Sequence, residues 1–156
     1  MADSDEVFLA VGGAVEVVAA RVAEVLGLGD GLEPEDGSGE WAFVGRARTV
    51  DAPMGVFIGP NYLGSEPGVL TALDAYPVMV DIQFRTHKPL QAEEARLAFE
   101  LMVAGMPDVP ALLVHNVELL VAAYVPGQAP RYFEADLTPD AEDVETWGRG
   151  YCGRIE

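Results

Sequence analysis

Residues 77–87 alternate between apolar and more polar side chains, and this pattern constrains the fold more than any other feature of the chain. The apolar residues are Val78, Val80, Ile82 and Phe84. The residues that alternate with them are Met79, Asp81, Gln83 and Arg85. A period of two residues predicts a β-strand with one buried face and one wetter face. Such strands are typical of antiparallel sheets, and Pro89 marks the expected end of this one.

Two further pairs of strands are expected on either side of it. Residues 41–50 and 55–63 are separated by a turn sequence that contains Pro53, so they predict a hairpin. The apolar run 110–126 is too long for one ordinary strand of about 5–6 residues. We therefore divide it near Asn116 into strands at 111–116 and 119–125.

Three helices are predicted around these strands. Apolar residues recur at spacings of three and four from Phe8 to Val25, which favours one helix over residues 5–27. The competing interpretation places a strand at 7–11 and starts the helix after Gly12-Gly13, because two glycines cost a helix about 2 kcal/mol. Residues 91–104 predict a second helix, and a cap followed by proline predicts a third over 138–147.

The expected fold is therefore α+β, with a mostly antiparallel five-stranded sheet and helices packed on it, in a single domain that spans residues 1–156. Residues 30–40 are expected to form an acidic loop, and the acidic segment 134–156 is expected to have a loose end. The order helix, three strands, helix, two strands, helix resembles that of class I type III secretion chaperones and the related bacterial sensory-transduction-regulator proteins. This resemblance implies a protein-binding module without catalytic activity, and a homodimer formed through the second helix or the long strand.

The charge of the chain excludes several classes of partner. The sequence holds 26 acidic and 9 basic residues, a net charge of −17, and its only lysine is Lys88. Phosphate binding needs a clustered basic face, so we expect no nucleic acid and no anionic membrane surface as partner. The negative surface either keeps the chain soluble or steers a basic protein partner towards it. The lone Cys152 and an N-terminus without a secretory signal indicate the cytoplasm.

No catalytic motif is evident, and we expect neither a cofactor nor a metal ion. His115 lies among apolar residues and is most simply a hydrogen-bonded histidine of the sheet. Cys152 lies in a glycine-flanked tail, Gly150-Tyr151-Cys152-Gly153, in which a nucleophile would be poorly buried and positioned. An enzyme or small-molecule binder would instead require a cavity that His115 or Asp81 faces, with a perturbed pKa.

The candidate partner-binding residues are polar or aromatic side chains on the expected strand face, on a bend and near the C-terminus: Asp81, Gln83, Arg85, Tyr62 and Trp147. The predicted function is that of a chaperone- or adaptor-like module, or of an immunity-type inhibitor of a basic protein. The alternative is a small-molecule-binding protein or an enzyme with an unrecognised pocket.

Overall fold

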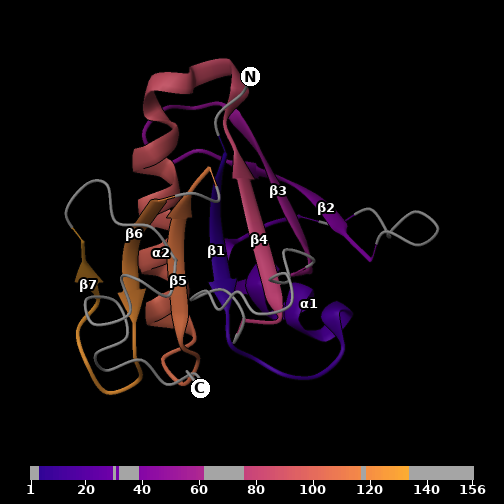
Figure 1. Cartoon of the computed structure of the whole chain (residues 1–156). Helices are drawn as coiled ribbons and strands as arrows, with labels where there is room; N and C mark the ends of the chain where they lie inside the picture. The colour runs from indigo at the N-terminus through magenta and orange to yellow at the C-terminus, as the bar shows by residue number, and fades with distance from the viewer. Residues whose placement is uncertain (1–3, 30, 32–38, 62–75, 117–118, 134–156) are drawn as a thin grey trace.

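A computed structural model of the chain describes residues 4–29, 31, 39–61, 76–116 and 119–133. In this part of the chain, two α-helices, a 3₁₀ helix and an antiparallel seven-stranded sheet make an α+β fold, as the sequence predicts (Figure 1). In chain order the elements are β1 (Asp5–Leu9), α1 (Val15–Leu26), β2 (Trp41–Arg46), β3 (Pro53–Pro60), β4 (Val78–Gln83), the 3₁₀ helix η2 (Arg85–Leu90), α2 (Gln91–Gly105), β5 (Ala111–His115), β6 (Leu119–Tyr124) and β7 (Arg131–Tyr132).

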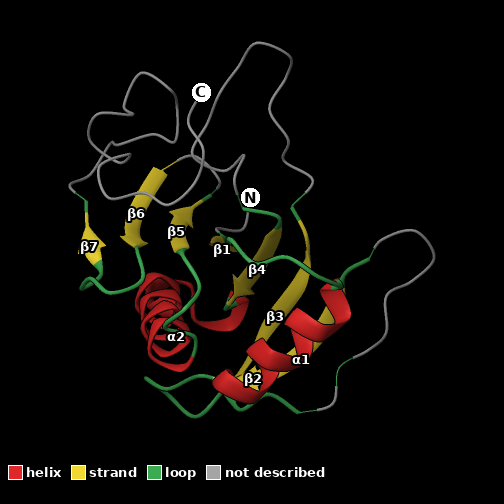
Figure 2. Cartoon of the chain, turned by 90° about the horizontal axis from the view of Figure 1, so that it is seen from below, coloured by secondary structure: helices red, strands yellow, loops and turns green. Residues whose placement is uncertain are grey.

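The sheet has the strand order β2-β3-β4-β1-β5-β6-β7, and β1 lies between β4 and β5. Both helices pack on one face of the sheet, α1 over β2 and β3 and α2 over β4, β1 and β5 (Figure 2). We call this face the helix face and the opposite one the outer face. Neither α-helix of the described part is long and apolar enough to cross a lipid bilayer.

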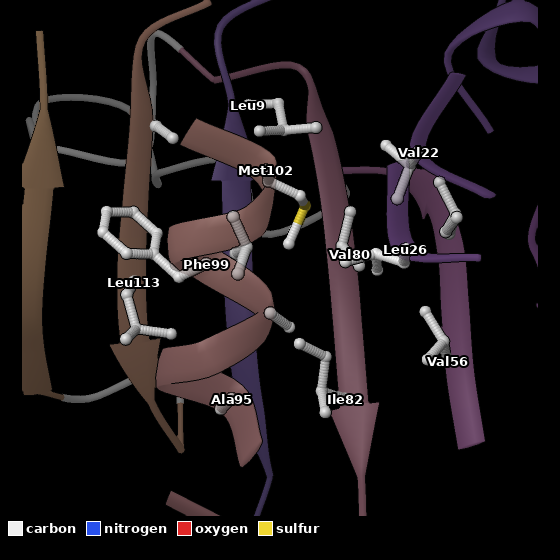
Figure 3. Close-up of a cluster of buried hydrophobic side chains, with 14 of the residues drawn as sticks. Leu9, Val22, Leu26, Val56, Val80, Ile82, Ala95, Phe99, Met102 and Leu113 are labelled. Carbon is white, nitrogen blue, oxygen red and sulfur yellow. The ribbon is translucent and has the colours of Figure 1, made fainter. Parts of the chain in front are cut away.

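The main core fills the space between the helices and the sheet. Figure 3 shows Phe99 and Met102 of α2 and Leu26 of α1 among inward side chains of the strands. A smaller set of buried residues lies on the outer face of the central strands: Phe8, Tyr76, Met79, Leu112, Val114 and Leu120. Because β1 is buried on both faces, its last three residues, Val7-Phe8-Leu9, are all apolar where a half-buried strand would alternate, and its first two, Asp5 and Glu6, are buried acids.

The prediction of one helix over 5–27 is wrong, and the competing interpretation is closer. Residues 5–9 form β1, and the helix begins only at Val15. Gly13 lies between them with a φ of 104°, a conformation that glycine adopts freely and other residues rarely do. The helix ends as expected at Gly27, whose φ of 68° is typical of a left-handed C-cap.

The prediction that strand 77–87 continues to His87 is also wrong, because β4 ends at Gln83. The backbone N–H of Phe84 donates to Oε1 of Gln91 at 2.8 Å, and its carbonyl accepts from the N–H of His87. These bonds satisfy the Phe84 backbone in a turn rather than in the sheet. Arg85 therefore lies at the start of η2 and not on the strand.

The predicted hairpin is confirmed as β2 and β3, and the divided apolar run is confirmed as β5 and β6. The helix predicted at 91–104 is α2. The sheet has seven strands where five were predicted, because β1 replaces the start of the first helix and the two-residue β7 was not expected. The helix predicted at 138–147, the segment 134–156 and most of the loop 30–40 lie outside the described residues.

The turn between β2 and β3 is fixed by a buried carboxylate from α2. Glu94 is fully buried, and its Oε2 accepts the backbone N–H groups of Thr49 at 2.6 Å and Arg48 at 2.8 Å. The Arg48 guanidinium in turn donates to the carbonyl of Leu26 at the end of α1, at 3.0 Å. The turn of the hairpin is therefore hydrogen-bonded to both helices, and these bonds fix the position of β2 and β3.

Candidate functional site

A hollow opens on the outer face where three strands place Val44, Gly55 and Gln83 side by side. Val44 of β2 pairs with Gly55 of β3, and Gly55 pairs with Gln83 of β4. Since glycine has no side chain, the Phe57 ring packs closely over the middle of this row. A Cβ atom built on Gly55 would come within 3.1 Å of the Phe57 ring, so that ring forms one wall.

The hollow is a shallow pocket of about 300 Å³ with mainly apolar walls. Its lining residues come from β2, β3, β4 and η2: Val44, Pro53, Met54, Gly55, Phe57, Gln83, Arg85 and Thr86. Val44 is 70 % exposed, a high value for a valine on a sheet. We call these residues the Gly55 pocket.

Arg85 supplies the positive charge at the rim of the Gly55 pocket. Among the arginines of the described part, it alone makes no hydrogen bond, salt bridge or ring contact. This is notable in a chain in which acidic residues outnumber basic ones by 26 to 9. The early end of β4 carries Arg85 away from the row of strand side chains and towards the pocket.

Asp81 lies beside the pocket and orients Gln83, although it does not line the pocket itself. The Gln83 amide nitrogen donates to Asp81 Oδ2 at 2.9 Å, while Asp81 Oδ1 is buried without a hydrogen-bond partner among the described residues. Burial raises the pKa of Asp81, and the nearby carboxylates of Glu40 and Asp5 raise it further. The hydrogen bond from Gln83 and the charge of Arg85 act in the opposite direction.

The two edges of the described sheet differ in the protection they carry. Strand β2 is six residues long, has no register shift against β3, and carries no charged residue before Arg46. No described strand pairs with its other side. At the opposite edge, β7 has two residues, and the Tyr132 hydroxyl donates to Glu100 at 2.5 Å. A short edge strand offers few backbone groups for pairing with another chain, whereas a long apolar edge strand favours such pairing.

His115 belongs to a hydrogen-bonded network at the start of β1, on the helix face of the sheet and therefore on the side opposite the Gly55 pocket. Its Nδ1 lies 2.8 Å from Asp5 Oδ1, and its Nε2 lies 3.3 Å from the Asn116 amide nitrogen. Gln91 donates to the other oxygen of Asp5 at 2.9 Å. The predicted interpretation of His115 as a hydrogen-bonded histidine of the sheet is confirmed, and the residue does not line the pocket.

The structure brings together three of the five candidate residues from the sequence. Gln83 and Arg85 line the pocket and Asp81 holds Gln83, whereas Tyr62 and Trp147 lie outside the described residues. Sequence reasoning missed Val44, Gly55 and the Phe57 wall. An isolated glycine within a strand was the available signal, because it marks a place where another group approaches the backbone closely.

Among the described side chains, no group of three or more His, Cys, Asp or Glu residues could hold a metal ion. Comparison of the chain with protein-family models, with curated proteins and with solved structures found no match. Its function is therefore inferred from its own surface and chemistry.

Proposed function

We propose that the chain is a non-catalytic module that binds another protein on the outer face of β2, β3 and β4. The observation that carries this proposal is the Gly55 pocket itself, an apolar hollow that begins at the exposed Val44 on an edge strand. Exposed apolar patches with a polar rim mark interaction surfaces, because leaving them in water costs free energy that a partner recovers. The rim here is polar, with Gln83, Arg85 and Thr86 on the side of β4.

The unprotected edge of β2 adds a second contribution to the same surface. A partner that reaches the pocket passes over β2, whose outward backbone groups pair with no described strand. Main-chain hydrogen bonds to such an edge supply affinity without requiring a particular sequence, and the pocket supplies specificity. This combination favours an extended segment of a protein over a compact surface.

The net charge favours a basic protein as the partner. The described residues hold eleven acidic and seven basic residues, a net charge of only −4, so most of the −17 belongs to the rest of the chain. A field of this size acts over a Debye length of about 8–10 Å and accelerates the encounter with a basic protein. Because most of this charge lies outside the described residues, it does not determine which chemical groups the Gly55 pocket binds.

The biological role within this proposal is that of a chaperone, an adaptor or an immunity-type inhibitor. The resemblance to secretion chaperones supports it only through the order helix, three strands, helix, two strands, which runs from α1 to β6 and is preceded by β1 and followed by β7. The proposed homodimer is part of the same resemblance. If a second copy of the chain occupied β2, the edge would be a surface for self-association and the proposal of another protein as occupant would fail.

A pair of matched variants tests the proposal. Val44→Lys places a charge on the proposed surface, and Val17→Lys makes the same change on α1, where Val17 is 65 % exposed. Affinity capture from native lysate with the wild type and both variants, read by mass spectrometry, should yield a basic protein that is retained by the wild type and Val17→Lys but lost with Val44→Lys. Equal capture by all three would overturn the proposal, as would light scattering that shows a dimer only Val44→Lys disrupts.

A further inference from the structure

We propose that the Gly55 pocket accepts an apolar side chain whose neighbouring carboxylate binds Arg85, so that the partner segment carries an apolar group next to a negative charge. The inference rests on the proposed function and specifies the chemistry of the bound segment. Such a carboxylate belongs either to the C-terminus of a partner or to an acidic side chain within it, and both present the same group to Arg85.

The first argument is the complementarity of the two halves of the pocket. Its floor and walls on β2 and β3 are apolar, from Val44 through Gly55 to Phe57, and an apolar side chain fills such a space. On the side of β4 the pocket carries donors, chief among them the Arg85 guanidinium. Arginine binds carboxylates through two parallel hydrogen bonds, the geometry for which its planar group is suited.

The second argument is that the Arg85 guanidinium makes no hydrogen bond, salt bridge or ring contact in the described structure, although its charge acts on the nearby Asp81. The neighbouring carboxylate of Asp81 accepts its hydrogen bond from Gln83 and makes no salt bridge with Arg85. The other described arginines are held by Asp108, Asp51, Glu100, the Leu26 carbonyl or the Phe133 ring. An unpaired guanidinium beside an apolar hollow leaves a place for an anion from outside the chain.

The third argument is that the spacing between β3 and β4 is comparable to the spacing between neighbouring residues of a bound segment. Adjacent strands are about 4.8 Å apart, so Gln83 of β4 lies one such step from Gly55 of β3. Successive Cα atoms are about 3.8 Å apart. A residue with its side chain in the pocket, beside the Phe57 ring, therefore brings its own terminal carboxylate, or the side chain of the next residue, within reach of the long Arg85 side chain beyond the end of β4.

The probes are two random heptapeptide libraries displayed on phage, one with a free C-terminus and one held within a surface loop. Selection on the full chain should enrich sequences that have an aliphatic or aromatic residue next to a carboxylate. Enrichment in the first library alone assigns the carboxylate to a C-terminus, and enrichment in the second assigns it to an acidic side chain. Enriched sequences without a carboxylate, or no enrichment in either library, would overturn the inference.

An enriched peptide is then labelled and titrated by fluorescence anisotropy against the wild type, Arg85→Gln and Lys88→Gln. Lys88 lies on η2 with Arg85 but does not line the pocket, so it controls for the loss of one positive charge. Loss of the charge-assisted bonds should weaken binding about tenfold in Arg85→Gln and less than about twofold in Lys88→Gln. Equal effects in the two variants would refute the role of Arg85.

Two further variants separate this inference from the proposed function. Gly55→Val fills the hollow, and Val44→Lys changes the surface at the edge; circular dichroism checks that each remains folded. Capture of the basic protein that fails with Val44→Lys but survives in Arg85→Gln would leave the proposed function intact and overturn the inference. Peptide and protein binding that none of the three variants changes would overturn both.

Discussion

Replacing the buried Glu94 by glutamine should destabilise the protein through the turn between β2 and β3. The Glu94 carboxylate accepts three contacts from two backbone N–H groups, at 3.0 and 2.8 Å from Arg48 and at 2.6 Å from Thr49. A glutamine keeps one acceptor oxygen, but its amide nitrogen then faces the N–H of Arg48, and no charge assists the bonds that remain. A hydrogen bond to a charged group contributes about 1.5–3 kcal/mol, roughly twice a neutral one.

From these contacts we expect Glu94→Gln to lower the free energy of unfolding by about 2 kcal/mol and Glu94→Ala by about 4 kcal/mol. The assay is urea unfolding followed by circular dichroism. The control is Glu93→Gln, an exposed acid in the same first turn of α2, which experiences the same helix dipole but does not contact the turn. Equal unfolding midpoints for Glu93→Gln and Glu94→Gln would refute the reasoning.

The same residue gives the stability a defined pH dependence. Burial alone would raise the pKa of Glu94, but the hydrogen bonds from Arg48 and Thr49 outweigh it and hold the pKa below its ordinary value of 4.5. The folded state therefore binds this proton less tightly than the unfolded state does. The stabilisation is complete above about pH 4.5 and is lost as the pH falls below it, so the wild type should lose more stability on acidification than Glu94→Gln. Parallel curves for the two proteins would contradict this assignment.

Two other substitutions test features of the sheet and of the helix packing. Burial raises the pKa of Asp81 above its ordinary value of 3.8, so its ionisation costs the folded state stability as the pH rises above that value. Asp81→Asn should therefore melt at a higher temperature than the wild type at pH 7 and at a similar one at pH 3, and a lower melting temperature at pH 7 would count against it. Gly105→Ala should destabilise the protein by about 1–2 kcal/mol in urea unfolding, because its Cβ atom would meet Val25 at 2.8 Å where α1 crosses α2. Gly12→Ala, which has open space around it, should change the stability by less than about 0.5 kcal/mol, and equal effects of the two changes would contradict the packing argument.

Local patterns predicted those parts of the fold that local forces determine. The hairpin of β2 and β3 follows from its turn, and α2 follows from its acidic first turn and its apolar face. At the N-terminus, the apolar spacing across Gly12-Gly13 imitates one helix, while Gly13 in fact adopts a positive φ in the connection between β1 and α1. There the backbone freedom of glycine outweighs the hydrophobic period.

The pocket could be predicted only in part, because it depends on which strands are neighbours. Asp81, Gln83 and Arg85 were candidates from their alternation along one segment. Val44 and Gly55 join them only through the register of β2, β3 and β4, which no local pattern determines. The turn of Arg85 into η2 likewise depends on Gln91, whose side chain binds the Phe84 backbone seven residues earlier in the chain.

The central claim is that the partner occupies the outer face at β2 and β3. Hydrogen exchange measured by mass spectrometry, on the free protein and on its complex with the captured partner, tests it most directly. The account predicts slower exchange over 41–46 and 53–60 in the complex, with α1 (Val15–Leu26) unchanged. Protection confined to α1 or α2, with β2 exchanging as fast as in the free protein, would contradict it.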